Sequence, residues 1–395
     1  MNSPSHTAER RLLIGAAAAT CIANISWWMQ PQIVNDVLTN LHTSESAAGF
    51  VVTAEFAVMA FTSFAIARLG RGTSYFAISV LGAVFALAGA TLTLASGGYP
   101  LLIGARALTG LGEGAALMVS TAAVAHLSNP DRAYAQLNIV NICLGAAMSL
   151  ALPALSEHYG AAALSFKVLF GVMLVLVAIS LVTPRAERYA PPAPVAAGGG
   201  VSMRVIAVAL AVFLVAVASS AMWSFYVVLG LRTGMSAEAV DQSIAYAVLS
   251  ALPAGILATF VGTRFGRFNA AAVAVAVIVV AIFLITYTKD ATSFRIGTCV
   301  NVAGIYFLIP YFFGFAAAED ASGRAAAIAG GAFLLTGAAG PYLGGSLMEY
   351  LGVSATPWVM LVTDAVALAL FLWLERTRTG AHAGSGATAL AEASP

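Results

Sequence analysis

Charged side chains are scarce in this chain. Only 9% of its 395 residues are Asp, Glu, Lys or Arg, whereas 60% are hydrophobic. Soluble domains carry roughly a quarter charged residues, so a soluble fold with this composition would expose large apolar patches and aggregate. The net charge of +1 also provides no strong attraction to nucleic acid or to acidic partners. The composition therefore excludes an ordinary soluble domain and predicts an integral membrane protein that binds no nucleic acid.

Sequence features of enzymes and metal sites are also missing. Cys21, Cys143 and Cys299 lie in apolar stretches, at spacings that suggest neither a disulfide nor a metal site. The chain has no Gly-x-x-x-x-Gly-Lys loop for a nucleotide, no His-Glu-x-x-His and no cluster of Asp and His at metal-binding spacing. We therefore expect no enzymatic activity, no direct use of ATP, no cofactor and no metal ion.

The sequence does contain a series of apolar runs of about 20 residues, the length that crosses a bilayer as a helix. Runs this long fit helices rather than the alternating strands of a membrane barrel. The Ala-rich start resembles a signal peptide, but its apolar run continues through Trp27, Trp28 and Ile33, so we expect an uncleaved first span. The sequence predicts an all-α membrane protein with twelve transmembrane helices. They cover residues 12–34, 47–67, 75–94, 101–124, 135–155, 164–182, 205–229, 244–261, 271–287, 296–315, 325–347 and 358–374.

The basic residues indicate how the spans are oriented. With the N-terminus in the cytoplasm, most of the loop arginines face the cytoplasm, as the positive-inside rule requires. Only three basic residues then lie in loops on the other side, namely Arg232, Lys289 and Arg295. This bias favours an even number of spans with both termini in the cytoplasm. We expect a monomer in a bacterial inner membrane.

The two halves of the chain resemble each other. The segment "RAYAQLNIVNICLGAAMSLALPALSEHYG" begins at Arg132, and "RAAAIAGGAFLLTGAAGPYLGGSLMEYLG" begins at Arg324. They align without a gap, and the alignment pairs Gly145 with Gly337. Because the two segments occupy equivalent places among the predicted spans, the match indicates an internal duplication.

Duplicated six-span halves are an architecture of secondary transporters, which bind their solute between the halves near the membrane midplane. We therefore predict two pseudo-symmetric six-helix halves, residues 1–183 and residues 204–376. The Pro-, Gly- and Ala-rich stretch between them, residues 184–203, is predicted to be a flexible cytoplasmic linker. The small and polar tail, residues 377–395, is predicted to be disordered.

With this organisation the chain resembles the major facilitator superfamily. The family's loop motif after the second span contains Asp-Arg-x-Gly-Arg, and both halves match it except at the Asp, which is Ala67 in the first half and Thr263 in the second. The matching residues are Arg68, Gly70, Arg71, Arg264, Gly266 and Arg267. The resemblance implies that these residues belong to the gate on the cytoplasmic side.

Two further motifs of the family lie within spans. The fourth-span motif Arg-x-x-x-Gly-x-Gly, frequent among proton-coupled members, is intact as Arg106, Gly110 and Gly112. The Gly/Pro motif associated with antiporters is degenerate in the fifth span and better preserved in the eleventh, at Gly337 and Pro341. The resemblance implies a transporter that alternates access to its binding site by rocking two halves.

Two charges, Arg106 and Glu113, lie inside one apolar run. Each charge at the middle of a bilayer costs at least roughly 3 kcal/mol, so both must face protein or water. They are seven residues apart, about 10 Å along a helix, which places them on one face but too far apart to pair directly. Glycines at 110, 112 and 114 allow a neighbouring helix or a ligand to approach Glu113 closely. Either Glu113 takes up and releases a proton while Arg106 biases that equilibrium or attracts an anion, or both residues are structural.

Glu55 is a second acid in the middle of a span, and the corresponding position in the second half is apolar, near Ala251. A specialised proton-coupling site would show this asymmetry, and so would drift. Asp364 lies in the last span, which the resemblance places at the periphery of the fold, so we expect a structural hydrogen bond there.

The resemblance implies that the first, fourth, seventh and tenth spans line the solute cavity. Their candidates for solute contact are polar and aromatic: Asn24, Trp28, Gln30, Trp223, Tyr226, Asn301 and Tyr306. Amides supply hydrogen bonds and Trp supplies a flat apolar wall, which suits a small amphipathic or aromatic solute. Two alternatives stay open, because Trp28 also fits the lipid interface and Asn301 also fits a helix–helix contact.

These observations predict secondary active transport of a small organic solute, coupled to protons through Glu113, Glu55 and Arg106. Efflux by proton antiport competes with uptake of an organic anion by proton symport. The intact fourth-span motif favours antiport, whereas Arg106 in the cavity would favour the anion. A non-transporting receptor or scaffold is the remaining class, and it needs no titratable group in a span. The expected partners are a small-molecule solute, protons and the lipid bilayer.

Overall fold

The computed structural model describes residues 6–124, 126–160, 162–185, 201–320 and 324–392, and within these residues the chain forms fourteen helices and no strand. The helices are α1 (His6–Trp28), α2 (Gln30–Leu41), α3 (Glu45–Leu69), α4 (Tyr75–Leu94), α5 (Tyr99–Val124), α6 (Pro130–Tyr159), α7 (Leu164–Ser180), α8 (Met203–Ser224), α9 (Tyr226–Arg232), α10 (Ala237–Val261), α11 (Arg267–Tyr287), α12 (Ala291–Glu319), α13 (Arg324–Tyr350) and α14 (Thr356–Glu392).

The helices fall on the predicted spans. Within the described residues, ten helices are long and apolar enough to cross a membrane, and α1 with α2 forms an eleventh, bent span. The apolar helix α7, with 17 residues, lies at the place of the predicted sixth span but is shorter than the others. The prediction of an all-helical, multi-pass membrane protein is confirmed.

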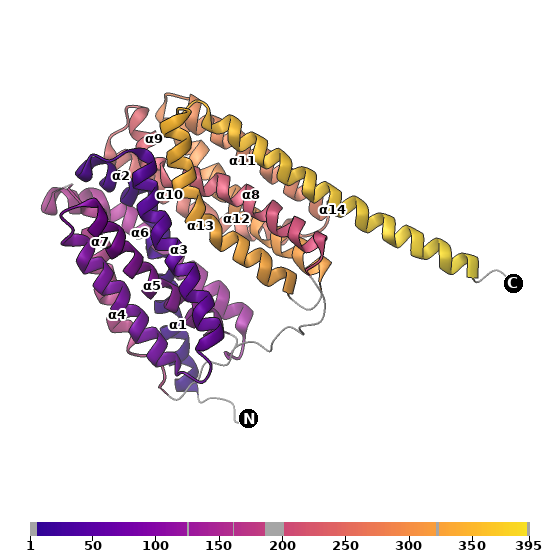
Figure 1. Cartoon of the computed structure of the whole chain (residues 1–395), viewed down its shortest axis with the longest axis horizontal. Helices are drawn as coiled ribbons and strands as arrows, with labels where there is room; N and C mark the ends of the chain where they lie inside the picture. The colour runs from indigo at the N-terminus through magenta and orange to yellow at the C-terminus, as the bar shows by residue number, and fades with distance from the viewer. Residues whose placement is uncertain (1–5, 125, 161, 186–200, 321–323, 393–395) are drawn as a thin grey trace.

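Figure 1 shows the helices in two bundles, α1–α7 in indigo to magenta and α8–α14 in pink to yellow. The principal contacts between the bundles run between α3 and α13 and between α6 and α10. The bundles lie close together at the end that holds α2 and α9, which we call the α2 end, and they diverge toward the opposite end, where α3 ends and α8 begins (Figure 1).

The predicted first span is not continuous, and this corrects the sequence analysis. It breaks at Met29, and α1 and α2 differ in direction by 48°. Pro31 explains the break, because proline has no backbone N–H and its ring crowds the preceding turn. The carbonyl of Trp27, which the N–H of residue 31 would bind in a regular helix, is thereby free for another donor. The predicted seventh span is also interrupted, at Phe225 between α8 and α9.

The predicted boundaries of the linker and of the tail can be compared with the ends of α8 and α14. The predicted linker, residues 184–203, falls largely on residues 186–200, which lie outside the described ones, and α8 begins at Met203. The tail was expected to be disordered from residue 377, whereas α14 continues to Glu392. The apolar part of α14 ends at Thr377, so the remaining turns extend beyond the membrane-spanning length.

Small residues allow the two bundles to meet at backbone distance. A side chain at Gly49 of α3 would collide with the carbonyl group of Pro341 in α13, and one at Gly345 would collide with the carbonyl group of Glu45. The repeat-related glycines lie against adjacent residues of α1: Gly145 of α6 lies against Trp28, and Gly337 of α13 lies against Trp27. The duplicated positions therefore enclose the tryptophan pair of α1 from two sides.

Candidate functional site

A buried cluster of charges lies where α1, α3 and α5 meet. Its members are Ser26, Glu55, Arg106 and Glu113, and each is at most 1% exposed. Arg106 donates from Nε to Oε2 of Glu55 at 3.0 Å and from Nη2 to Oε1 of the same carboxylate. Nη2 also donates to the hydroxyl of Ser26 at 2.9 Å, and that hydroxyl donates to Oε1 of Glu113 at 2.5 Å. The three predicted coupling residues are thus brought together in one network.

The glycines of α5 explain why these side chains meet. Gly110 lies one turn after Arg106 and faces the backbone of Glu55: a Cβ there would lie 2.9 Å from the carbonyl carbon of Glu55 and 3.2 Å from its Cα. One turn further on, a Cβ at Gly114 would lie 2.8 Å from Cβ of Thr62. Because both positions lack a side chain, α3 approaches α5 closely and the carboxylate of Glu55 reaches the guanidinium group.

The cluster is unbalanced in charge. Arg106 neutralises one carboxylate, and both guanidinium contacts to an acid go to Glu55. Glu113 accepts one hydrogen bond at Oε1, while its Oε2 has no hydrogen-bond partner within the described residues. With one arginine and two carboxylates, the network is neutral only when it holds one proton. The neutral form is favoured because an uncompensated charge in a buried site is costly. This arrangement has the chemistry of a site that binds a single proton.

Ser26 is the member that the sequence analysis did not assign. Arg106 and Glu113 do not pair directly, as their spacing predicts, and the hydroxyl of Ser26 bridges them. The signal in the sequence is weak, since Ser26 is one polar residue in the polar stretch "NISWWMQPQ". Its role depends on which face of α1 meets α5, and helix contacts of this kind are not encoded in the spacing of one segment.

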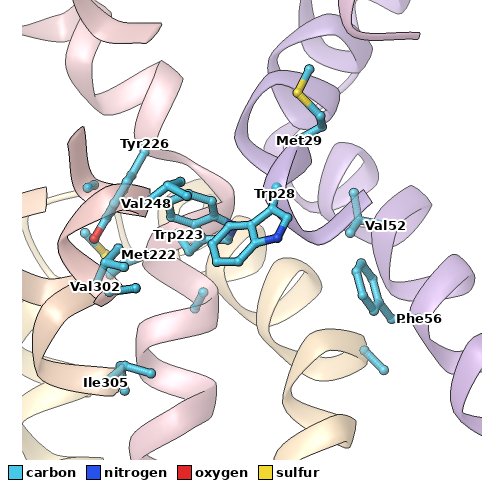
Figure 2. Close-up of a cluster of buried hydrophobic side chains, with 14 of the residues drawn as sticks. Trp28, Met29, Val52, Phe56, Met222, Trp223, Tyr226, Val248, Val302 and Ile305 are labelled. Atoms are coloured by element: carbon cyan, nitrogen blue, oxygen red, sulfur yellow. The ribbon is translucent and has the colours of Figure 1, made fainter. Parts of the chain in front are cut away.

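A cavity of about 40 Å³ lies between the bundles. Its lining comes from α1, α8, α12 and α13, and it includes Trp28, Ser219, Trp223, Asn301 and Tyr306. Figure 2 shows the indole of Trp28 extending from the first bundle toward Trp223 of the second. The rings of Trp28 and Tyr306 are stacked at 6.1 Å between centroids, and Trp28 meets Trp223 edge-on at 6.3 Å.

Most of the predicted solute-contact residues gather at this cavity. Trp28, Trp223, Asn301 and Tyr306 line it, and the hydroxyl of Tyr226 donates to Oδ1 of Asn301 at 2.8 Å. Trp28 is only 2% exposed, so it faces protein and not the lipid interface, which was the alternative. Asn301 joins two helices through its hydrogen bond with Tyr226 and also lines the cavity, so both of its alternatives stay open.

Two predicted solute-contact residues lie elsewhere. Asn24 donates from Nδ2 to the carbonyl of Thr20 at 2.9 Å, within its own helix, and does not belong to the cavity lining. Gln30 is fully buried at the start of α2, and neither polar atom of its side chain has a partner in the part of the chain that the structure describes. The structure therefore does not bring Asn24 and Gln30 together with the other predicted solute-contact residues.

Polar contacts join the bundles from the cavity to the α2 end. The carbonyl of Trp27, left free by Pro31, accepts a hydrogen bond from Nε1 of Trp223 at 2.9 Å. Nearer the α2 end, Gln32 donates to Asp241 at 3.1 Å. Further contacts between the bundles are the hydrogen bond from the backbone N–H of Ser46 to Glu349 at 3.0 Å and the ion pair of Arg232 with Glu45 at 3.7 Å. Hydrogen bonds and one ion pair therefore hold the two bundles together at the α2 end.

The predicted gate residues lie at the opposite end. Arg68, Gly70 and Arg71 lie at the connection of α3 to α4, and their repeat-related counterparts Arg264, Gly266 and Arg267 lie at the connection of α10 to α11. Gly337 and Pro341 lie in the middle of α13 against α1 and α3.

Asp364 differs from its prediction. It is buried in α14, and neither carboxylate oxygen has a hydrogen-bond partner among the described residues, whereas a structural hydrogen bond was expected.

Comparisons with known proteins agree with this architecture. A family model described as the Major Facilitator Superfamily matches residues 16–318. Among curated proteins, no sequence matches the chain.

Several solved structures share the fold. A POT family peptide transporter, crystallised in an auto-inhibited form, superposes with a TM-score of 0.75 at 13% identity, over 93% of this chain and 97% of that one. A bacterial homologue of the human lysosomal transporter Spinster, in an inward-facing and unoccupied conformation, gives a TM-score of 0.73 at 13% identity, over 95% and 98% of the two chains. A mutant of the nucleoside transporter NupG gives 0.72 at 12% identity, over 93% and 99%.

Proposed function

This chain belongs to the major facilitator superfamily, and we propose that it exports a small organic solute in exchange for protons by alternating access. The family and its structural neighbours are transporters, which supports secondary transport and points away from an enzyme. The two bundles are the moving units in this proposal, and the cavity between them is the solute site. The protein acts as a monomer.

The observation that carries proton coupling is the buried network of Glu55, Arg106, Ser26 and Glu113. With one arginine and two carboxylates, it changes between a neutral form and a form with one negative charge when a single proton leaves. Glu113 is the carboxylate that holds this proton, because Glu55 is already neutralised by Arg106. The unpartnered Oε2 of Glu113 is the atom that binds it.

The network is connected to the solute site through α1. Ser26, which contacts both Arg106 and Glu113, directly precedes the cavity residues Trp27 and Trp28 in the same helix. When Glu113 loses its proton, its negative charge strengthens the hydrogen bond from Ser26 and draws this part of α1 toward α5. Proton release is therefore coupled to a movement of the cavity wall, because Ser26, Trp27 and Trp28 belong to the same turn of α1.

Antiport is favoured over uptake of an organic anion. The anion alternative depends on Arg106 in the cavity, but its guanidinium group is committed to Glu55 and Ser26, and the residue is not in the lining. The intact motif of Arg106, Gly110 and Gly112 supports proton coupling through the family resemblance.

The distribution of the arginines supports an orientation in the membrane. The arginine-rich end opposite to α2 lies in the cytoplasm of a bacterial inner membrane, with both termini on that side. The polar contacts at the α2 end then hold the bundles together on the outer side, and the bundles diverge toward the cytoplasm (Figure 1). A receptor or scaffold would need neither the proton site nor two bundles that separate.

Spectroscopic distances between the bundles test the coupling without a known solute. Spin labels on Thr73→Cys and Thr263→Cys, in a background without the native cysteines, report the separation of exposed positions at the cytoplasmic end. We expect the distance distribution from double electron–electron resonance to change between mildly acidic and mildly alkaline pH. The change disappears in Glu113→Gln and persists in Glu157→Gln, which replaces an exposed glutamate of α6. An unaltered pH response in Glu113→Gln would refute the assignment.

A further inference from the structure

We propose that the transported solute is a small, uncharged molecule with one aromatic ring and a hydrogen-bond acceptor, bound in the cavity between α1, α8, α12 and α13. This inference rests on the proposed function, because it takes the cavity as the solute site. It adds the chemical class, which follows from three properties of the lining.

The first property is the lack of charge. Within the described part of the chain, the lining contains no Asp, Glu, Lys, Arg or His. Arg106, the cation of the buried charge cluster, already binds Glu55 and Ser26 and is not part of the lining. A charged solute buried here would lack a counter-ion, and a buried charge without a partner is strongly disfavoured. The cavity therefore selects an uncharged molecule.

The second property is that the indole N–H groups of both tryptophans are already bonded to other parts of the protein. The indole N–H of Trp28 is used by Oδ1 of Asn141 at 2.9 Å, and that of Trp223 is used by the carbonyl of Trp27 at 2.9 Å. With these donors occupied, Trp28, Trp223 and the stacked ring of Tyr306 offer π-surfaces to the cavity. Aromatic rings prefer stacked or edge-on contact with other rings, so the walls select a flat aromatic group over an aliphatic one of similar size.

The third property is a set of buried polar atoms without partners. Oδ1 of Asn301 accepts the hydroxyl of Tyr226, which leaves Nδ2 as a donor with no acceptor in the described chain. Ser219 and Ser220 each present a hydroxyl that also lacks a partner among the described residues. Asn301 and Ser220 are 2% exposed and Ser219 is 6% exposed, so water does not readily satisfy them. A buried donor left unpaired is destabilising, and a solute carbonyl would supply the missing acceptor.

The small size of the cavity favours a small solute and requires the cavity to open for it. A volume of about 40 Å³ holds a few water molecules, whereas a cavity that binds benzene measures about 150 Å³. The walls must therefore separate to admit an aromatic ring. Trp28 belongs to one bundle and Tyr306 to the other, so the movement that separates the bundles also opens the stacked pair.

A matched set of four compounds tests the class. Benzamide has the ring, the acceptor and no charge. Benzoate adds a negative charge, benzylamine adds a positive charge and removes the acceptor, and cyclohexanecarboxamide keeps the amide but lacks the ring. Binding is measured by isothermal titration and by quenching of tryptophan fluorescence on the full chain in detergent, up to millimolar concentration. We expect saturable binding of benzamide and at least about tenfold weaker binding of the other three, since a factor of ten corresponds to about 1.4 kcal/mol.

Variants assign the binding to this cavity. Asn301→Ala and Ser219→Ala each weaken benzamide binding, by about tenfold for Asn301→Ala, which corresponds to about 1.4 kcal/mol. The control is Ser224→Ala, because Ser224 is a buried serine on the same helix whose hydroxyl bonds to the carbonyl of Ser220 at 2.8 Å. It leaves binding unchanged. The thermal unfolding of each variant without ligand separates lost binding from lost folding, and Ser219→Ala keeps the test decisive if Asn301→Ala does not fold.

The outcomes distinguish the two proposals. The solute class would be overturned if benzamide did not bind, if benzoate or benzylamine bound more tightly than benzamide, or if cyclohexanecarboxamide bound equally well. It would also be overturned if neither Asn301→Ala nor Ser219→Ala weakened the binding of benzamide. The pH-dependent distance change between residues 73 and 263 is measured without any solute, so it can succeed while the solute class fails. Conversely, benzamide binding with no pH-dependent distance change would leave the class intact and refute proton coupling.

Discussion

Replacing Gly110 by alanine tests how the charge network is assembled. The added methyl group would lie 2.9 Å from the carbonyl carbon of Glu55 and 3.2 Å from its Cα, and closer still to the carbonyl oxygen. Carbon atoms in contact prefer a separation of about 3.5–4.0 Å, so α3 must move away from α5 by several tenths of an ångström or more. That movement separates Glu55 from Arg106, which lies one turn before Gly110.

The magnitude follows from two opposing terms. Alanine in place of glycine favours the helix by about 0.5–1 kcal/mol, because it restricts the unfolded chain and has a higher helix propensity. Forcing an extra methyl group into a packed interface costs about 1–3 kcal/mol. Subtracting the first term from the second gives a loss of about 0–2.5 kcal/mol in the free energy of unfolding in detergent, and we expect the upper half of this range because the methyl group meets backbone atoms of Glu55.

The same helix supplies a matched control. Gly104 is exposed, and a Cβ there would meet no atom within 4 Å. Gly104→Ala should therefore keep or slightly raise the thermal unfolding temperature, while Gly110→Ala lowers it and also removes the pH-dependent distance change between the bundles. Equal unfolding temperatures for the two variants, or a normal pH response in Gly110→Ala, would refute the reasoning that glycine packing builds the network.

Three further predictions concern the polar contacts. Arg106→Gln removes the cation that pairs with Glu55 and should cost about 3–5 kcal/mol, whereas Arg106→Gln combined with Glu55→Gln should cost less than the sum of the single changes, as a double-mutant cycle of thermal unfolding will measure. Trp223→Phe removes the indole donor to the Trp27 carbonyl, a hydrogen bond worth about 0.5–1.5 kcal/mol. It should raise the population of molecules whose bundles are separated at the α2 end by about two- to tenfold. Distances between spin labels at that end measure this population. Ser26→Ala should abolish the pH response while Ser26→Thr restores part of it, and a full response in Ser26→Ala would contradict the bridging role.

The membrane fold could be predicted from the sequence because its cause is local. Apolar runs of bilayer length and scarce charges suffice to place the spans, and the duplicated segments of the two halves fall on α6 and α13. The break at Met29 was missed although Pro31 is visible in the sequence. A proline within an apolar run does not by itself tell whether a helix bends or stops, since the result depends on whether a partner, such as the indole N–H of Trp223, donates a hydrogen bond to the freed carbonyl.

The site could be predicted only in part. Buried charge identifies Glu55, Arg106 and Glu113 individually, because each is costly in a membrane unless it has a partner. Their assembly depends on which faces of α1, α3 and α5 meet, and that is why the bridging role of Ser26 was not found. The aromatic and amide residues of the cavity could be chosen from their chemistry, but chemistry does not show which face of a span meets the cavity, and Asn24 and Gln30 lie outside its lining.

Infrared difference spectroscopy between mildly acidic and mildly alkaline pH tests most directly whether Glu113 carries the coupled proton. A protonated carboxyl group gives a carbonyl stretching band that an ionised carboxylate lacks. The wild-type chain should show this band in the pH difference spectrum, Glu113→Gln should lose it, and Glu157→Gln should keep it. A band that survives unchanged in Glu113→Gln would show that another group carries the proton.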